Sequence, residues 1–244
     1  VFCCQHQEDV TAPEAPDTTA NYYVSVTGDN SNKGTFDSPL KTIQAGIDSL
    51  QPGQTLYIRE GVYQERIVIS ESKSGTLEKP TIIWGYPGET PVITGDYSGI
   101  GSWNLVLISG SHILFGNAEV SYSSGRGINV YAGESEFLGE AYANSQKYVT
   151  LADVEVHHTK NAGIIAEWVD NLTIQSRVLW QNNQINNPDS DFFEDCYWSG
   201  AVTVRRGAHF LLEDNKIYES YGEGVNIHGG AIDVTIQDNV VYNT

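Results

Sequence analysis

A short unit repeats five times in the second half of the chain. Each unit opens with an apolar, variable, apolar triplet, and a further apolar residue follows the first one seven positions later. The triplets begin at Ile113, Val149, Leu172, Phe210 and Val234, so their spacings are 36, 23, 38 and 24 residues. A unit of 23 to 24 residues cannot bury its own core. This period, with two enlarged units, therefore predicts a solenoid whose units stack on one another.

Each unit has the composition and the period of β-strands. Polar and apolar residues alternate, and Val, Ile, Leu, Thr and Tyr predominate. The third strand of each unit follows a glycine, at Gly127, Gly163, Gly200 and Gly224. Glycine suits a tight corner that needs a positive φ or a close backbone approach. Three short strands per unit predict an all-β fold, a right-handed parallel β-helix.

A helix is expected before the repeats. Ser38 and Pro39 are typical of an N-cap and a first helical position. Four apolar residues then fall on one helical face: Leu40, Ile43, Ile47 and Leu50. This apolar face needs the open end of the first coil to cover it. We therefore expect a capping α-helix from about Pro39 to Leu50 at the N-terminal end of the solenoid.

The ends of the chain are expected to differ from its middle. Glu8 to Ala20 is rich in Thr, Pro, Ala and acid, which predicts that residues 1–20 form a disordered tether. The opening Val1-Phe2-Cys3-Cys4 suggests the remnant of a bacterial lipoprotein signal, with a lipid on one cysteine. Residues 21–244 are expected to form one β-helix domain. Because Thr244 directly follows the second strand of a coil, we expect the natural protein to continue beyond it.

The net charge narrows the choice of partners. The formal charge is −18 at pH 7, which argues against binding to nucleic acid or to an anionic membrane surface. No apolar stretch is long enough for a transmembrane helix. An anionic polysaccharide would be repelled unless calcium or a basic patch such as Arg205-Arg206 offsets the field. We expect a monomer that is secreted or held on the bacterial cell surface.

The third strands place polar residues in columns. If the apolar residues of these strands face inward, two outward columns result: Asn129, Ile165, Thr203 and Asn226, and beside them Tyr131, Glu167, Arg205 and His228. Neighbouring coils are roughly 4.8 Å apart, so one sugar unit could contact several of these side chains. The enlargements at residues 134–146 and 184–199 flank the same strand, which predicts a walled groove.

Further candidates lie near this strand. Tyr221 and Glu223 precede the last third strand and border the same face. In the 184–199 segment, Trp198 is a candidate for stacking on sugar rings, and the alternative is that it pins the loop to the β-helix. The same segment offers oxygen ligands for calcium in Asp189, Asp191 and Asp195. A solvated acidic loop is the alternative for these three aspartates.

Motifs in the first half of the chain resemble a known family. They are Tyr22-Tyr23-Val24-Ser25, the Ser38 to Gln44 run, the Gln51 to Arg59 run, Gly61-Val62-Tyr63 and Gly85 to Glu89. Together with the repeats, they resemble the pectate-lyase-like β-helix superfamily, notably the family-nine polysaccharide lyases. The resemblance implies a right-handed β-helix that acts on polysaccharide. It also implies a lysine base and calcium held by acidic residues, yet none of the third strands carries a lysine.

Three functions remain open. In a lyase, Arg205 would stabilise charge and His228 or a tyrosine would move the proton, while Tyr131, Asn129, Asn226, Tyr221, Arg206 and Trp198 would bind the glycan. In a glycoside hydrolase, Glu167 and Glu223 would be the paired carboxylates. A non-catalytic glycan-binding scaffold is the third reading, in which Glu167 and Arg205 form an exposed ion pair beside a spectator histidine.

Overall fold

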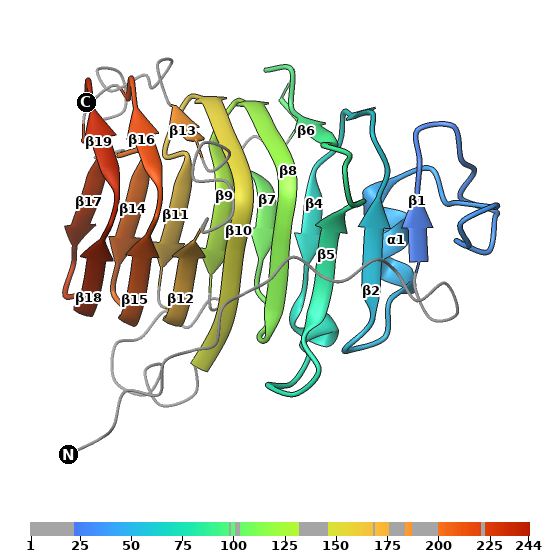
Figure 1. Ribbon diagram of the computed structural model, residues 1–244, viewed down its shortest axis with the longest axis horizontal. Helices are drawn as coiled ribbons and strands as arrows, with labels where there is room; N and C mark the ends of the chain where they lie inside the picture. The colour runs from blue at the N-terminus through green and yellow to red at the C-terminus, as the bar shows by residue number, and fades with distance from the viewer. Residues whose placement is uncertain are drawn as a thin grey trace.

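The strands of this protein stack side by side into one solenoid (Figure 1). The computed structural model describes residues 22–97, 99–100, 103–131, 146–167, 169–175, 184–186, 200–220 and 223–244. The described helices are α1, Ile43–Ser49, and a short 3-10 helix, Glu71–Lys73. All pairs of named strands in these residue ranges are parallel.

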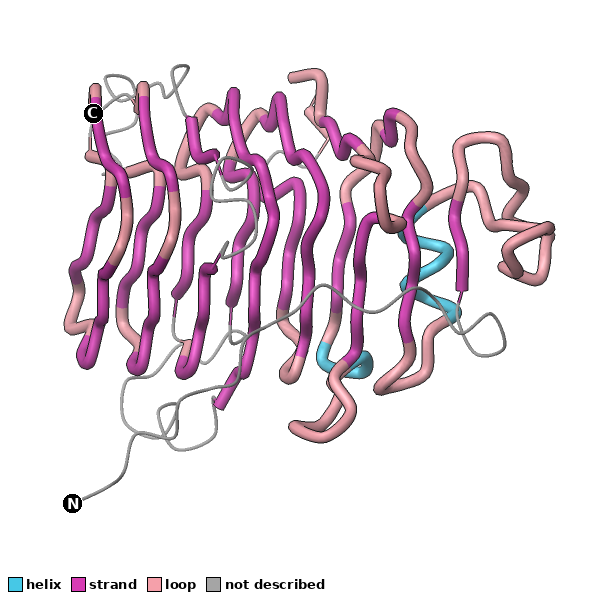
Figure 2. Tube along the Cα trace, in the orientation of Figure 1, coloured by secondary structure: helices cyan, strands magenta, loops and turns pink. Residues whose placement is uncertain are grey.

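The strands form three faces. The first face consists of β1 (Tyr22–Val24), β2 (Thr55–Ile58), β5 (Thr81–Gly85), β8 (Ile113–Ser123), β10 (Gln146–Thr159), β12 (Asp170–Gln175), β15 (Ala208–Glu213) and β18 (Ile232–Gln237). The second face adds β3 (Val62–Tyr63), β6 (Val92–Thr94), β13 (Gln184–Asn186), β16 (Lys216–Tyr218) and β19 (Val240–Tyr242). Because β8 and β10 are long enough to pair on both, these two faces form one bent sheet (Figure 2).

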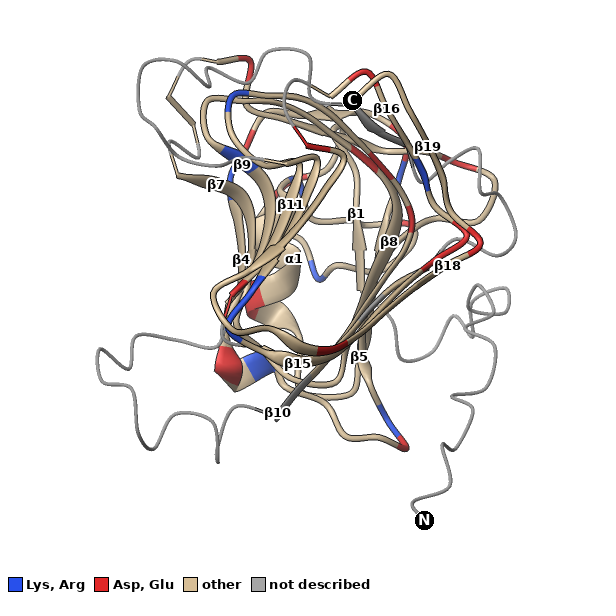
Figure 3. Cartoon of the chain, turned by 90° about the vertical axis from the view of Figure 1, so that its left-hand side faces the viewer, with Lys and Arg blue, Asp and Glu red and all other residues tan. Residues whose placement is uncertain are grey.

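The third face is a separate six-stranded sheet. In chain order its strands are β4 (Ile67–Ile69), β7 (Asn104–Ile108), β9 (Arg126–Tyr131), β11 (Ile164–Glu167), β14 (Val202–Arg205) and β17 (Val225–His228). Seen from the C-terminal end, the labelled strands β4, β7, β9 and β11 lie together on one side of the stack (Figure 3). The predicted three strands per coil are therefore confirmed, and the fold is a parallel β-helix.

The core runs through the middle of the stack. On the first face, the register places Ile83, Phe115, Leu151, Ile174 and Leu212 in one column. All five are completely buried. Each inward side chain is covered by the coils on either side, so the repeats found in the sequence are the core positions.

Glycine is required at the corner before β9 because of a close approach between coils. A Cβ on Gly127 would lie 2.6 Å from the carbonyl oxygen of Gly163 in the next coil. A positive φ, the other reason that the sequence suggested for a glycine at this corner, is not found at Gly127. Any larger residue here would push two neighbouring coils apart.

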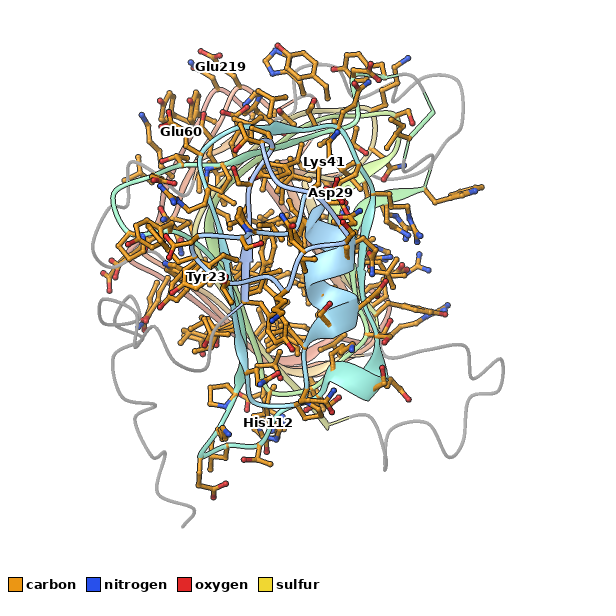
Figure 4. All side chains as sticks on the ribbon, turned by 90° about the vertical axis from the view of Figure 1, so that its right-hand side faces the viewer. Tyr23, Asp29, Lys41, Glu60, His112 and Glu219 are labelled. Atoms are coloured by element: carbon orange, nitrogen blue, oxygen red, sulfur yellow. The ribbon has the colours of Figure 1, made fainter. Side chains whose placement is uncertain are left out.

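Helix α1 lies at the N-terminal end of the stack (Figure 4). Ile43 and Ile47 are completely buried and belong to the continuous core. The carboxylate of Glu65 accepts hydrogen bonds from Ile43 N–H at 2.8 Å and Gln44 N–H at 3.0 Å. Burial raises the pKa of Glu65, and these two bonds oppose that rise. The carboxylate thus satisfies two of the free donors in the first turn.

The expected start of this helix is wrong. The N-cap is Thr42, whose side chain accepts from Ala45 N–H, and helical residues begin at Ile43 rather than Pro39. Leu40 instead forms a parallel bridge with Val24. The side chain of Asn30 accepts from Lys41 N–H at 2.9 Å and Thr42 N–H at 3.0 Å. These tertiary hydrogen bonds use the backbone donors of residues that local propensity would assign to the helix.

Candidate functional site

The register of the third face aligns the two predicted columns. Tyr131 pairs with Glu167, Glu167 with Arg205, and Arg205 with His228. The neighbouring column runs through Asn129, Ile165, Thr203 and Asn226. These positions come from four successive strands, so residues 23 to 38 positions apart in the sequence become neighbours.

Glu167 binds two arginines. Its Oε1 lies 2.5 Å from Arg205 Nε, and its Oε2 lies 2.9 Å from Arg126 Nη1. The side chain of Glu167 is only 5% exposed, against 33% for Arg205 and 24% for Arg126. The expectation of an exposed ion pair is therefore wrong for the carboxylate. A buried carboxylate with two cationic partners carries a local net charge of +1, opposite in sign to the whole chain.

Arg126 is the residue that the sequence reading missed. It begins β9 and shares the strand phase of Ile128 and Val130, which are buried in the core. Alternation therefore assigned Arg126 no place on the outer face. It stands five positions before Tyr131, the register partner of Glu167, so its side chain must run along the sheet to reach that carboxylate. The one available signal was that a guanidinium cannot remain in an apolar core.

A second polar contact extends this face toward the N-terminus. Asn129 Nδ2 donates to Asn104 Oδ1 at 2.9 Å, and Arg66 Nε donates to the Asn104 carbonyl at 3.1 Å. Asn129 and Asn226, which we expected to bind substrate, are both buried. Asn129 therefore acts within the described structure as a link between β9 and β7.

The other predicted residues on this face lie around Arg205. His228 is half-buried beside it in register, and no hydrogen-bond partner of its ring is found in the described part of the chain. Arg206 follows β14 with a φ of 55°, which takes it out of the strand. Glu223 is exposed two residues before β17, and its carbonyl accepts from Ala201 N–H at 2.9 Å.

Several predicted residues lie outside the described ranges. They are Tyr221, Trp198, Asp189, Asp191 and Asp195, together with nearly all of the 134–146 and 184–199 segments. The walls of the predicted groove and the proposed calcium ligands therefore stay predictions.

The described residues of this face do not fit a calcium site. Both oxygens of Glu167 are already held by arginines, and Ca²⁺ requires six to eight oxygen ligands. Across the described ranges, no group of three or more His, Cys, Asp or Glu side chains is arranged to hold a metal ion.

A different polar cluster lies on the second face. Glu119 Oε1 is 3.1 Å from His157 Nε2, and the Nδ1 atoms of His157 and His158 are 2.5 Å apart. The ring of Tyr122 stacks on His158 at 4.8 Å. The hydrogen bond to His157 holds the pKa of Glu119 below its usual range, whereas burial raises the pKa of Glu155. These side chains satisfy one another, as expected of a structural cluster.

The stacked coils agree with a family comparison. Residues 22–197 match the family model described as the Pel9A-like right-handed β-helix region. The chain belongs to this family. The family assignment supplies the right-handed sense of the coils and confirms the resemblance that the motifs suggested.

Two curated relatives are pectate lyases. The chain is 39% identical over 77 residues to pectate lyase PEL9 of Emericella nidulans, which is 32% of this chain and 19% of the relative. It is 28% identical over 210 residues to pectate lyase L of Paenibacillus polymyxa, which is 80% of this chain and 43% of the relative. The chain thus spans less than half the length of each.

Among solved structures, a rhamnogalacturonan lyase superposes with a TM-score of 0.52 at 12% identity, covering 91% of this chain and 62% of that one. The complex of XylC with xylose gives 0.53 at 9% identity, covering 90% and 66%. At such low identity these two likenesses show the fold alone. None of the described helices is both long and apolar enough to span a bilayer.

Proposed function

We propose that the chain is the β-helix of a polysaccharide lyase that cleaves a uronate-containing glycan on its third face. The observation that carries the proposal is the geometry of Arg205. Its Nε forms an ion pair with Glu167 Oε1 without the geometry of a hydrogen bond, its two Nη groups remain available, and no other partner of its side chain is found in the described residues. A planar guanidinium with free Nη groups is suited to a substrate carboxylate.

The proposed reaction is a β-elimination. A base removes the proton on C5 of the uronate, and that electron pair forms the C4–C5 double bond. The C4–O bond then breaks, and the leaving oxygen takes up a proton. Arg205 would bind the carboxylate next to C5 and stabilise the charge that develops there. His228, beside Arg205 in register, would move the proton.

Glu167 is assigned a positioning role. Its two oxygens hold Arg205 and Arg126, so it fixes the orientation of the guanidinium groups without contacting the glycan. The same contacts argue against a hydrolase that uses Glu167 and Glu223. A nucleophilic or acid carboxylate must have an oxygen free for the sugar, and Glu167 has none.

The test is an incubation of the purified chain with polygalacturonate and with a panel of plant and algal polysaccharides. A lyase produces unsaturated uronides, detected by their absorbance, in step with new reducing ends. New reducing ends without that absorbance would identify a hydrolase instead. Retardation in a polysaccharide gel without any cleavage would identify a glycan-binding scaffold.

Variants test the role of Arg205. We expect Arg205→Ala to lower turnover by about 100-fold or more, because a charge-stabilising donor is lost. Arg205→Lys keeps the positive charge but loses the paired N–H donors of the guanidinium, so its activity should lie between that of the wild type and that of Arg205→Ala. Lys79→Ala removes an exposed positive charge from another region and serves as the control. Full activity in a folded Arg205→Ala would overturn the proposal.

We further propose that the protein acts as a monomer outside the cell. The acidic composition and the polysaccharide-acting relatives support this location. The proposed tether and lipid attachment fall on residues 1–20, outside the described ranges. Size-exclusion chromatography with light scattering tests the oligomeric state, and mass spectrometry of the protein purified from its natural source tests the lipid.

A further inference from the structure

Trp103 differs from the other exposed aromatic residues. In the described chain, four aromatic side chains are counted among the exposed large hydrophobics, and Trp103, at 75%, is the most exposed of them. The other three are packed: Phe36 under Arg59, Tyr122 on His158 and Tyr242 on Tyr218. Within the described ranges, the indole of Trp103 has no ring, cation or hydrogen-bond partner. Both an aromatic face and a donor N–H therefore remain available.

The backbone that carries this indole is firmly held. The Trp103 carbonyl accepts from Arg126 N–H at 3.0 Å. The next residue, Asn104, is in register with Arg126 and is bonded through its side chain to Asn129 and through its carbonyl to Arg66. An exposed ring on such a fixed support loses little backbone freedom when it binds a ligand.

Trp103 lies on the same face as the candidate site. It directly precedes β7 of the six-stranded sheet, and Arg126, which holds its carbonyl, also reaches Glu167. Six register positions separate Trp103 from Tyr131, the partner of Glu167, which corresponds to at most roughly 20 Å along the strands. Only a glycan several sugar units long would contact both places.

We propose that Trp103 is a distal subsite for the glycan that is processed at Arg205. The apolar C–H face of a pyranose would stack on the indole, and a ring hydroxyl would accept the Nε1–H. This inference rests on the proposed function, because it places both contacts on one glycan chain. It also predicts something that the proposed function does not: the affinity for an oligosaccharide should depend on its length, and this dependence should require Trp103.

The test is calorimetric binding of oligogalacturonates of increasing length to the full chain and to Trp103→Ala. In the wild type, affinity should rise once the oligosaccharide is long enough to reach Trp103. In Trp103→Ala this gain should be lost, weakening the binding of long chains by about threefold to tenfold relative to short ones. In turnover, the loss should appear in KM for long chains. Trp103→Phe, which keeps an aromatic face, should restore part of the gain.

Leu77→Ala is the matched control, because Leu77 is 71% exposed and lies in the loop before β5. Unchanged length dependence in Trp103→Ala would overturn the subsite while leaving the proposed function intact. If binding depends on chain length through Trp103 but no polysaccharide is cleaved, the subsite stands and the proposed lyase function is overturned. A wild type that binds no oligogalacturonate of any length would overturn the subsite, whereas the proposed function is overturned only if no polysaccharide of the panel is cleaved with formation of unsaturated uronides. Light scattering that shows a dimer broken by Trp103→Ala would assign the indole to a second copy and sink the subsite.

Discussion

The two ends of the solenoid bury their apolar residues to very different extents. At the N-terminal end, Val24, Ile43 and Ile47 are completely buried. In the last described coil, the equivalent inward positions are open: Ile227 is 40% exposed and Ile236 45%. The sequence pattern is the same at both ends, an alternation of inward apolar residues.

The difference shows that a coil does not create its own core. An inward side chain is buried only when another element lies on each side of it. Helix α1 supplies that second element at the first coil, while every coil between the ends has two neighbours. The energetic value of an apolar residue in this fold should therefore depend on its place along the stack more than on its type.

The sharpest test uses two isoleucines of one column. Ile174 and Ile236 occupy the same inward column, with Leu212 between them. Ile174 is completely buried, so Ile174→Ala should cost about 2–5 kcal/mol of unfolding free energy. In the 244-residue chain, Ile236→Ala should cost well under half of that, because the side chain is already 45% exposed there. Urea denaturation measures both, and equal losses would contradict the role of neighbouring coils.

A smaller loss of stability than at Ile174 is expected at Asn215 and Asn239, which lie at the corners between the first and second faces. Asn215 is buried, and its Nδ2 donates to the carbonyls of Ile174 and Glu213 at 3.1 and 2.9 Å. Asn215→Ala leaves these carbonyls without the donor, at a cost of about 1–3 kcal/mol. Asn239, one coil later and only half-buried, should cost less when replaced, since water can substitute for its amide.

Thermal unfolding of Asn215→Ala and Asn239→Ala ranks the two costs. A larger loss of stability for Asn239→Ala would mean that the energetic value of these asparagine hydrogen bonds, unlike that of the core residues, does not depend on the position of the coil in the stack.

The smallest effect concerns pH at the N-terminal end. Arg59 donates to Glu89 at 2.7 Å and packs over the rings of Phe36 and Tyr86. The bond from Arg59 holds the pKa of Glu89 below its ordinary value of 4.5. Because the folded-state pKa is lowered, this stabilisation is present above about pH 4.5 and is lost as the pH falls through the folded-state pKa.

Arg59→Gln should therefore lower stability at neutral pH, by up to about 1 kcal/mol from the ion pair. The gap between variant and wild type should narrow below pH 4.5. Denaturation midpoints measured at several pH values check this, with Lys79→Ala as the charge control. A gap that stays constant through this range would assign the effect of Arg59 to ring packing alone.

The sequence predicted the stack well because its information is periodic. Each inward position recurs with every coil. Equivalent residues such as Phe115, Leu151 and Leu212 therefore locate the strands of the first face and show that these strands run in the same direction. Once those positions were fixed, the register of Glu167 with Arg205 followed from counting along the strands. The start of α1 was less predictable, because Asn30 and Val24 compete for the backbone groups that a helix would use.

By itself, then, the sequence determined the parallel β-helix and the columns of the third face, since both depend on a period of two within strands and on a repeat between coils. The tertiary structure alone decided that Arg126 joins Glu167, that Glu167 is buried, and that no described residue partners the indole of Trp103. These outcomes depend on how a side chain turns at the corner of a coil and on what covers it. A one-dimensional pattern carries no information about either.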